Sequence, residues 1–477
     1  MNTRDREILQ IAVPSIVSNI TVPLLGLIDV AIVGHMGSAS YIGAVAVGSM
    51  IFNLVYWLFG FLRMGTSGLT AQAYGRQDQE EAASILRRSL KVALLSALAL
   101  IVLQVPLRWL MFWIIGPTPD VSPLATLYFR IVIWGAPAML GLYSLTGWFI
   151  GMQNTRIPMF ISIMQNVVNI LVSLLLVYGF GMKIEGVAIG TVVAQYAGLV
   201  LAIISRPSPI PLPIGRGVNS AEGNYSPPSR EGRGRGSSIN IDIFLRTLCL
   251  VAVNLYFTAA GARQGAVILS VNTVILQLYL LFSYFMDGFA YAGEALGGRF
   301  YGARDAKAFS ETLHHLFYWA AGVTAVYTVV YVIGGMWIVS LLTDEQPVVN
   351  AARDYIFWAW LIPVAGAAAF IWDGVFIGLT ATRGMLVSSA VSALLFFAIF
   401  TLGDRCWVMG DGGYSPSVHV NVDVNINPHH SPLTNHFLWL AQIVYLAMRG
   451  ILQTAWYLQM ERRQQILHSS LFTHHFL

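Results

Sequence analysis

The sequence predicts an all-α integral membrane protein with twelve transmembrane helices in two pseudo-symmetric lobes of six helices each. The first observation is composition, because 56% of the 477 residues are hydrophobic and only 10% are charged, against about 25% charged in soluble domains. The second is that the apolar residues form repeated blocks of about 20 or more, the length of a bilayer-spanning helix. The third is an internal repeat that relates the two halves of the chain.

The apolar blocks give the order of the predicted spans. They lie at about residues 9–34, 42–64, 88–115, 125–150, 157–179, 185–205, 243–261, 266–298, 312–342, 354–379, 385–403 and 437–459. The polar segment 206–240 is rich in Pro, Gly, Ser and Arg, which predicts a linker between a first lobe of residues 1–205 and a second lobe of residues 241–477. A second polar insertion, at about 404–435, contains the alternating run VHVNVDVNI, which predicts a small hairpin.

The distribution of Lys and Arg predicts the orientation in the membrane. Basic residues follow the even-numbered spans, for example Arg76, Arg87, Arg88, Arg156, Arg304, Arg383 and Arg462. Because cytoplasmic loops carry an excess of Lys and Arg, we expect both termini and the 206–240 linker to be cytoplasmic and the 404–435 insertion to be external. The protein is then a multi-pass protein of the inner (plasma) membrane. The net charge of +4 is small and lies mostly in loops, which argues against a nucleic-acid partner.

The internal repeat has a constant offset of 227 positions. The run Gly147–Gly151 (GWFIG) matches Gly374–Gly378 (GVFIG), and Thr-Arg follows at the same distance in both copies. The same offset relates Tyr128 to Tyr355, Tyr74-Gly75 to Tyr301-Gly302, and Asp78 to Asp305. Each half then holds six spans and enters the membrane in the same direction. Parallel repeats of this kind are a transporter architecture, with the substrate site at the repeat interface.

The opening segment from Leu9 to Gly37 carries one carboxylate, Asp29, together with Pro14 and Pro23. A carboxylate inside a membrane helix is costly and is commonly functional. A proline removes a backbone hydrogen bond and bends its helix, which a membrane bundle tolerates. A helix that bends and carries a titratable group predicts a conformational switch that responds to protonation. The alternative is that Asp29 caps a helix or pairs with an arginine near the outer end and has no further role.

Three polar residues on two later spans predict a pocket. Asn169 and Ser173 are four residues apart and share a helix face, and Thr191 lies on the next span. With Asp29 they offer one carboxylate and several oxygen atoms, which suits a proton or, less well, a small hard cation such as Na⁺. The alternative is that these side chains only join helices by hydrogen bonds, as is common in membrane bundles. The residues by themselves favour that alternative.

Four further charged residues in the spans are secondary candidates: Arg63, Asp287, Glu294 and Asp373. Arg63 and Asp287 lie near the ends of the similar runs FLRMG and YFMDG, so they predict either a charge pair across the lobes or two helix caps at a glycine break. Glu294 begins a more polar run and is expected to be half exposed. No histidine spacing predicts a metal site, and the absence of a GxxxxGK[ST] loop excludes the usual ATP-binding signature.

Several of these stretches resemble the multidrug and toxic compound extrusion (MATE) family, in its DinF-like branch. The matching stretches are LIDVAIVGHMG, FLRMGTSGLTAQAYGRQD, GWFIGMQNTRIPM, YFMDGFAYAGEALGGRFYGARD and DGVFIGLTATRGM. The resemblance covers nearly the whole chain apart from the two polar insertions. It implies two six-helix lobes that form a V around a central cavity. It also implies export of small-molecule organic cations or amphipathic drugs in exchange for H⁺ or Na⁺.

The resemblance also implies which residues bind the coupling ion. Family members with a first-lobe site have an aspartate on helix 1, an asparagine and an aspartate on helix 5, and a threonine on helix 6. By motif these positions fall on Asp29, Asn169, Ser173 and Thr191. Ser173 stands where the family often has the second aspartate, which weakens the case for Na⁺ and favours H⁺. The second-lobe site of other branches is not clearly matched.

We therefore expect a monomeric secondary antiporter that needs no cofactor and is not an enzyme, with Asp29 as the coupling carboxylate. Protonation of Asp29 would let helix 1 bend at Pro14 or Pro23. One alternative is a flippase for lipid-linked intermediates, which needs a cavity rich in Arg and Lys to bind pyrophosphate. Another is an enzyme resembling membrane prenyl transferases, which needs paired acidic motifs of the DDxxD type for Mg²⁺. The spans contain few basic residues and the sequence contains no DDxxD motif.

Overall fold

The computed structural model describes residues 2–34, 39–205, 231–410 and 432–462. These residues form helices joined by short loops, with no strand among them. Within α1 the side chains of residues 22–31, 33 and 34 lie outside the described part, as do those of 404–410 in α15. The predicted hairpin and residues 206–230 of the predicted linker also fall outside the described residues.

The first half of the chain contains nine α-helices and two short irregular helices in the described residues. They are α1 (Thr3–Gly34), α2 (Ala39–Leu58), α3 (Phe61–Gly75), α4 (Gln79–Val102), α5 (Gln104–Ile115), α6 (Ser122–Val132), η1 (Ile133–Gly135), α7 (Ala136–Gly151), α8 (Arg156–Leu174), η2 (Leu175–Gly179) and α9 (Ile184–Ile204). η2 is a π-helical continuation of α8. The break between α4 and α5 bends the chain by 72°.

The second half begins with α10 (Glu231–Arg263), which starts inside the segment expected to be a linker. It continues with α11 (Ala266–Gly302), α12 (Ala306–Leu342), α13 (Gln346–Tyr355), α14 (Phe357–Gly378), α15 (Thr382–Gly410) and α16 (Pro432–Arg462). The described residues contain ten helices long and apolar enough to cross a membrane, or eleven when α4 and α5 count as one span. The 32-residue helix α1 carries the remaining predicted span, 9–34.

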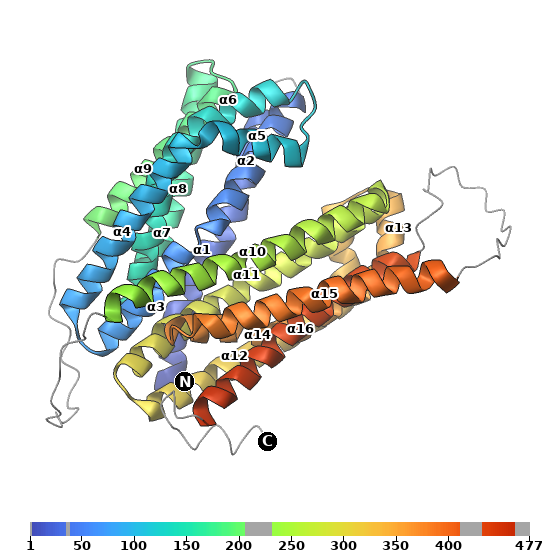
Figure 1. Ribbon diagram of the computed structural model, residues 1–477. Helices are drawn as coiled ribbons and strands as arrows, with labels where there is room; N and C mark the ends of the chain where they lie inside the picture. Colours follow the sequence, from blue (N-terminus) through green and yellow to red (C-terminus); the bar gives the residue numbers. More distant parts are fainter. Residues whose placement is uncertain (1, 35–38, 206–230, 411–431, 463–477) are drawn as a thin grey trace, which may run out of the picture.

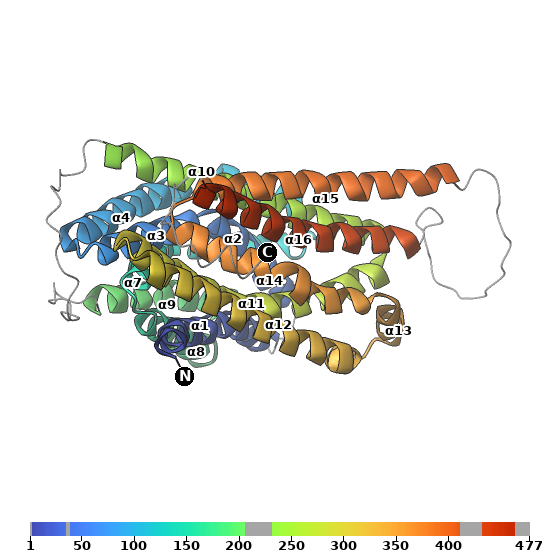
Figure 2. The same cartoon turned by 90° about the horizontal axis from the view of Figure 1, so that it is seen from below.

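The helices form two lobes that together have the shape of a V (Figure 1). The lobes meet near α3 and the turn between α11 and α12, and they diverge toward α6 and α13. In both views α15 and α16 run side by side along the second lobe (Figure 2). The all-helical, two-lobed fold predicted from the sequence is therefore confirmed.

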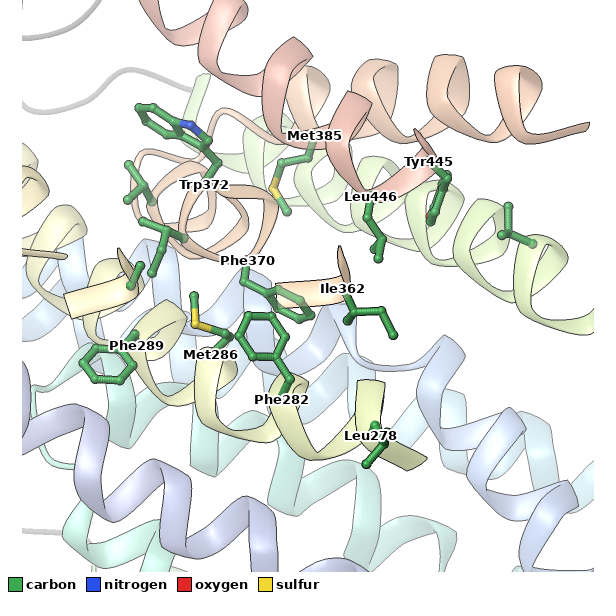
Figure 3. Close-up of a cluster of buried hydrophobic side chains, with 14 of the residues drawn as sticks. Leu278, Phe282, Met286, Phe289, Ile362, Phe370, Trp372, Met385, Tyr445 and Leu446 are labelled. Atoms are coloured by element: carbon green, nitrogen blue, oxygen red, sulfur yellow. The ribbon is translucent and has the colours of Figure 1, made fainter. Parts of the chain in front are cut away.

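Each lobe has an apolar core of its own. In the first lobe the rings of Phe52 and Phe129 stack with their centroids 5.2 Å apart. In the second lobe Phe282 of α11 meets Phe370 of α14 edge to face, with 6.0 Å between ring centroids. Figure 3 shows these two rings facing each other beside Met286. Burial of such side chains fixes the position of α11 against α14 and thereby the wall of the cavity described below.

The internal repeat is present in the backbone geometry. The four described non-glycine residues with positive φ form two pairs at the offset of 227: Gln77 (60°) with Arg304 (56°), and Gln153 (65°) with Thr380 (56°). After the first pair, Asp78 accepts a hydrogen bond from the backbone N–H of Glu81 at 2.8 Å, and Asp305 accepts one from Ala308 at 2.9 Å. Both carboxylates cap the following helix. The two turns are therefore copies of one structure.

The lobes make backbone contact where they meet. A Cβ atom on Gly75 would lie 2.0 Å from the carbonyl oxygen of Arg299, and one on Gly302 would lie 2.2 Å from that of Gln72. The Gln72 side chain donates a hydrogen bond across the interface to the carbonyl of Gly378 at 2.8 Å. Only glycine allows this approach, because any side chain would overlap the facing carbonyl. This closed end is the one that carries the start of α1 (Figure 1).

Polar contacts also join the start of α1 to the second lobe. Arg4 forms ion pairs with Glu7 at 2.8 Å and with Glu311 of α12 at 3.2 Å. Asp5 accepts hydrogen bonds from Nδ1 of His315 at 2.8 Å and from Nε1 of Trp319 at 3.1 Å. Helix α1 thus belongs to the first half of the sequence but is fastened to α12 at its amino end.

Candidate functional site

A polar cavity of about 170 Å³ lies between the lobes and is called the inter-lobe cavity below. Its walls come from α2 and α3 of the first half and from α10, α11, α14 and α16 of the second. Six charged side chains line it: Arg63, Arg246, Asp287, Glu294, Asp373 and Arg449. Aromatic side chains complete the lining: Trp57, Tyr279, Tyr291, Phe370 and Tyr445. All four secondary candidates from the sequence therefore lie around one cavity.

Asp373 of α14 is the most heavily bonded of the three acids. Its Oδ2 atom forms salt bridges with Arg246 of α10 and Arg449 of α16. Its Oδ1 atom accepts a hydrogen bond from the amide of Gln453 at 2.6 Å. Both arginine side chains are 5% exposed. Burying their two guanidinium groups without this carboxylate would cost a large free energy. Asp373 therefore joins three helices of the second lobe.

Arg63 forms a second charged pair, which crosses the lobe interface. Its Nη1 atom lies 3.2 Å from Oε2 of Glu294, and its guanidinium carbon lies 4.4 Å from the ring centroid of Tyr291. The Glu294 side chain is only 1% exposed, so the expectation that it would be half exposed is wrong. The helix around it is covered because Gly378 of α14 packs against its backbone. Glu294, and not Asp287, is the ion-pair partner of Arg63.

Asp287 lies in the same wall, about two helical turns before Glu294 on α11. It is a lining residue of the cavity, and it forms no salt bridge with any Lys, Arg or His in the part of the chain that the structure describes. Among the described residues, two of the three acids of the cavity thus have close cationic partners and one has none.

The first-lobe candidates form a separate cluster between α8 and α9. The side-chain amide of Asn169 donates to Oγ1 of Thr191 at 3.2 Å, and the Ser173 hydroxyl donates to Oδ1 of Asn169 at 3.3 Å. Gly190 permits this packing, since a Cβ atom there would lie 2.2 Å from the Ser173 oxygen. The structure therefore brings together three of the four residues predicted for the ion pocket.

The fourth residue, Asp29, lies on α1, but its side chain falls outside the described residues, as does that of Pro23. Pro14 is buried in the same helix. Contacts before Asp29 show that α1 runs along α8: Thr21 and Ser162 hydroxyls are 3.1 Å apart, and Asn166 donates to the Thr21 carbonyl at 2.9 Å. Helix α1 is thus a neighbour of the helix that carries Asn169 and Ser173.

Sequence reasoning missed the part that Arg246 and Gln453 play at Asp373. A signal was present, because Arg246 is a charged residue near the start of an apolar segment, where charges are rare. Its partner, however, lies 127 positions away along the chain. No group of three His, Cys, Asp or Glu side chains suited to a metal ion occurs among the described residues.

Comparisons with known proteins agree with this architecture. The family described as MatE matches residues 14–175 and 243–401. The DNA damage-inducible protein F of Escherichia coli (strain K12) is 35% identical over 457 residues, which cover 94% of this chain and 91% of that protein. The probable multidrug resistance protein NorM of Acinetobacter baylyi is 28% identical over 200 residues, or 41% of this chain and 44% of that protein.

Solved structures are similar over almost the entire chain. MATE in the straight conformation has a TM-score of 0.79 at 16% identity and covers 97% of this chain and 98% of its own. The outward-facing conformation of a multidrug resistance MATE family transporter of the MOP superfamily has a TM-score of 0.78 at 16% identity and covers 96% of both chains. These likenesses concern the fold. Together with the family match and the Escherichia coli relative, they establish that the chain belongs to the multidrug and toxic compound extrusion family of membrane transporters.

Proposed function

We propose that this chain is a secondary antiporter that exports organic cations or amphipathic drugs from the cell in exchange for protons. The observation that carries the proposal is the inter-lobe cavity, which holds three carboxylates and several aromatic rings inside a membrane bundle. Carboxylates attract cationic substrates, and aromatic faces bind organic cations through cation–π contacts. Relatives named as multidrug resistance proteins support this substrate class.

The coupling site that we propose is the first-lobe pocket, with Asp29 as the carboxylate that binds the proton. The hydrogen-bonded set of Asn169, Ser173 and Thr191 supports a polar pocket in this lobe. Ser173 supplies a hydroxyl where a second carboxylate would favour a metal cation, so the donor set suits H⁺ better than Na⁺. A low-dielectric site disfavours the charged form of a carboxylate, so the carboxylate takes up a proton more readily.

Protonation would then change the shape of α1. Neutral Asp29 no longer requires a polar environment, and α1 can bend at Pro14 or Pro23, where proline interrupts the backbone hydrogen bonds. Bending would shrink the first-lobe side of the central space and release substrate outward. In this proposal the protein acts as a monomer in the inner membrane, with both termini in the cytoplasm.

The flippase alternative is less well supported by the charges of the cavity. A lipid-linked pyrophosphate needs a surplus of positive charge. The three arginines that line the cavity are matched by three acids, and two of those acids are ion-paired with them. The enzyme alternative requires carboxylates that share a metal ion, and the described residues contain no group of three or more His, Cys, Asp or Glu side chains that could hold one.

Transport by purified protein in proteoliposomes tests the proposal. A pH gradient and a Na⁺ gradient are imposed separately while uptake of a fluorescent organic cation is followed. We expect the pH gradient to drive transport and Asp29→Asn to abolish it. The control is Asp120→Asn, which removes an exposed acid from a loop and should transport normally. Transport against a concentration gradient by Asp29→Asn would refute Asp29 as the coupling residue, and transport driven by Na⁺ alone would refute proton coupling.

A further inference from the structure

The inter-lobe cavity contains as many acidic as basic side chains, but these side chains do not form three separate ion pairs. Glu294 is committed to Arg63 at 3.2 Å. Asp373 is shared by Arg246 and Arg449, so this group of three side chains carries one surplus positive charge. The Nε atoms of both arginines are buried and have no hydrogen-bond partner among the described residues. The single carboxylate of Asp373 therefore leaves positive charge uncompensated in this wall.

Asp287 is the remaining charge, and it alone among the three acids has no close cationic partner in the described structure. When ionised, it makes the sum of the six charged groups zero. Without its charge the sum is +1. In a cavity walled by apolar helices such a difference acts strongly on any charged ligand, because the effective dielectric constant is low.

We propose that Asp287 is the residue that makes the cavity select cations over anions, and that Arg246 and Arg449 would turn the same cavity into an anion site if this carboxylate were lost. The inference rests on the proposed export of organic cations and names the side chain that meets their positive charge. Glu294 and Asp373 are positioning residues in this account, since their charges are already engaged by arginines. Asp287 stays open to the ligand.

The rings around Asp287 fit this assignment. Tyr279, Tyr291 and Phe370 line the cavity together with the carboxylate. Tyr291 is already covered by the guanidinium of Arg63, 4.4 Å from its ring centroid. Tyr279 and Phe370 belong to α11 and α14, the two helices that form the wall on which Asp287 lies. An organic cation in this wall would contact aromatic faces while its charge is met by Asp287.

Two probes of the same shape and opposite charge test the proposal directly. Tetraphenylphosphonium and tetraphenylborate differ in the sign of their charge at nearly constant size. Their equilibrium binding to the full-length protein in nanodiscs is measured against empty nanodiscs, which corrects for partition into lipid. We expect the wild type to favour the cation. In Asp287→Asn the affinity for the cation should fall at least tenfold, and the affinity for the anion should rise.

Two control variants make the result specific. Asp287→Glu keeps the charge and should keep the preference for the cation. Asp242→Asn removes an acid of α10 that is bonded to Thr382 and does not line the cavity, so its ratio of the two affinities should equal that of the wild type. An unchanged ratio in Asp287→Asn, with wild-type thermal stability, overturns the proposal.

The measurement is independent of coupling, because no ion gradient is applied. Binding that depends on Asp287 in a protein whose transport ignores the pH gradient would refute proton coupling and leave this assignment standing. Conversely, proton-driven transport with the same probe preference in wild type and Asp287→Asn would refute this assignment and leave the antiport proposal standing.

Discussion

At the scale of single residues, Asp373 illustrates how a membrane bundle can depend on one buried charge. Its two oxygen atoms contact side chains of α10 and α16 while its backbone belongs to α14. A buried ion pair gives little net stability compared with apolar packing, yet removing one partner leaves an uncompensated charge. The stability of the second lobe should therefore be very sensitive to this one carboxylate.

Asp373→Ala is expected to lower the free energy of unfolding by about 3–5 kcal/mol, because two buried guanidinium groups lose their shared counter-ion. Gln453→Ala removes one neutral donor and should cost less. Thermal unfolding in detergent, followed by size-exclusion chromatography of heated samples, compares the two. Equal losses of stability in both variants would contradict this role for the carboxylate.

At the scale of helices, the interface between the lobes depends on glycines in equivalent positions of the repeat. Gly75 ends α3 and Gly302 ends α11, and each faces the backbone of the other helix. The same relation recurs within each lobe, where Gly147 meets the carbonyl of Arg63 and Gly374 meets that of Ala290. Glycine places no side chain at the point where two helices cross, so the helices approach closely enough for backbone contact, as in other small-residue interfaces of membrane proteins.

Gly75→Ala and Gly302→Ala are each expected to destabilise the closed interface by about 1–3 kcal/mol, because the new methyl group would overlap a carbonyl that cannot move freely. Gly322→Ala in α12 is the matched control, since nothing lies within 4 Å of a Cβ atom at that position. Thermal unfolding of the three variants measures the difference. A loss of stability in Gly322→Ala equal to that of the other two would show that overlap at the interface is not the cause.

The helices and their repeat could be predicted from the sequence, whereas most partners in the site could not. Apolar periodicity and the offset of 227 depend on local patterns, and both survive in the structure as helices and as paired turns such as those at Gln77 and Arg304. The choice of Glu294 over Asp287 as the partner of Arg63 depends on how α3 is rotated against α11. That rotation is set by packing between distant segments, which a single sequence does not contain.

At the scale of the whole molecule, α1 connects the two lobes. Its amino end is bonded to α12, while further along the chain it runs beside α8. Gly288 of α11 also packs closely against it, since a Cβ atom there would lie 2.8 Å from the carbonyl oxygen of Ala12. A change in the shape of α1 therefore acts on both lobes.

The contact between Asp5 and His315 gives this connection a defined pH dependence. Asp5 precedes the apolar part of α1, and the hydrogen bond from His315 holds its pKa below the ordinary value for aspartate. A lowered pKa stabilises the folded protein above the unfolded value of about 3.9, and the effect is lost as the pH falls through the folded value.

Wild type should accordingly be more stable than Asp5→Asn between pH 8 and pH 5, and the difference should shrink once the pH falls below about 4 and disappear below the folded pKa of Asp5. Melting temperatures of both proteins across this range measure it. His315→Ala should remove most of the same difference, because it takes away the hydrogen-bond donor. A gap between wild type and Asp5→Asn that does not shrink below about pH 4 would contradict the assignment.

The matched acids and arginines of the inter-lobe cavity have an electrical consequence. With three of each, the empty cavity carries no net charge when every acid is ionised. Carrying one elementary charge across a potential of 100 mV involves about 2.3 kcal/mol of work. A transporter loaded with one proton and a transporter loaded with one monovalent drug cation carry the same added charge. If one proton is exchanged for one such cation, as proposed, the exchange is electroneutral, so membrane voltage does no net work on the cycle and the two concentration gradients alone set its direction.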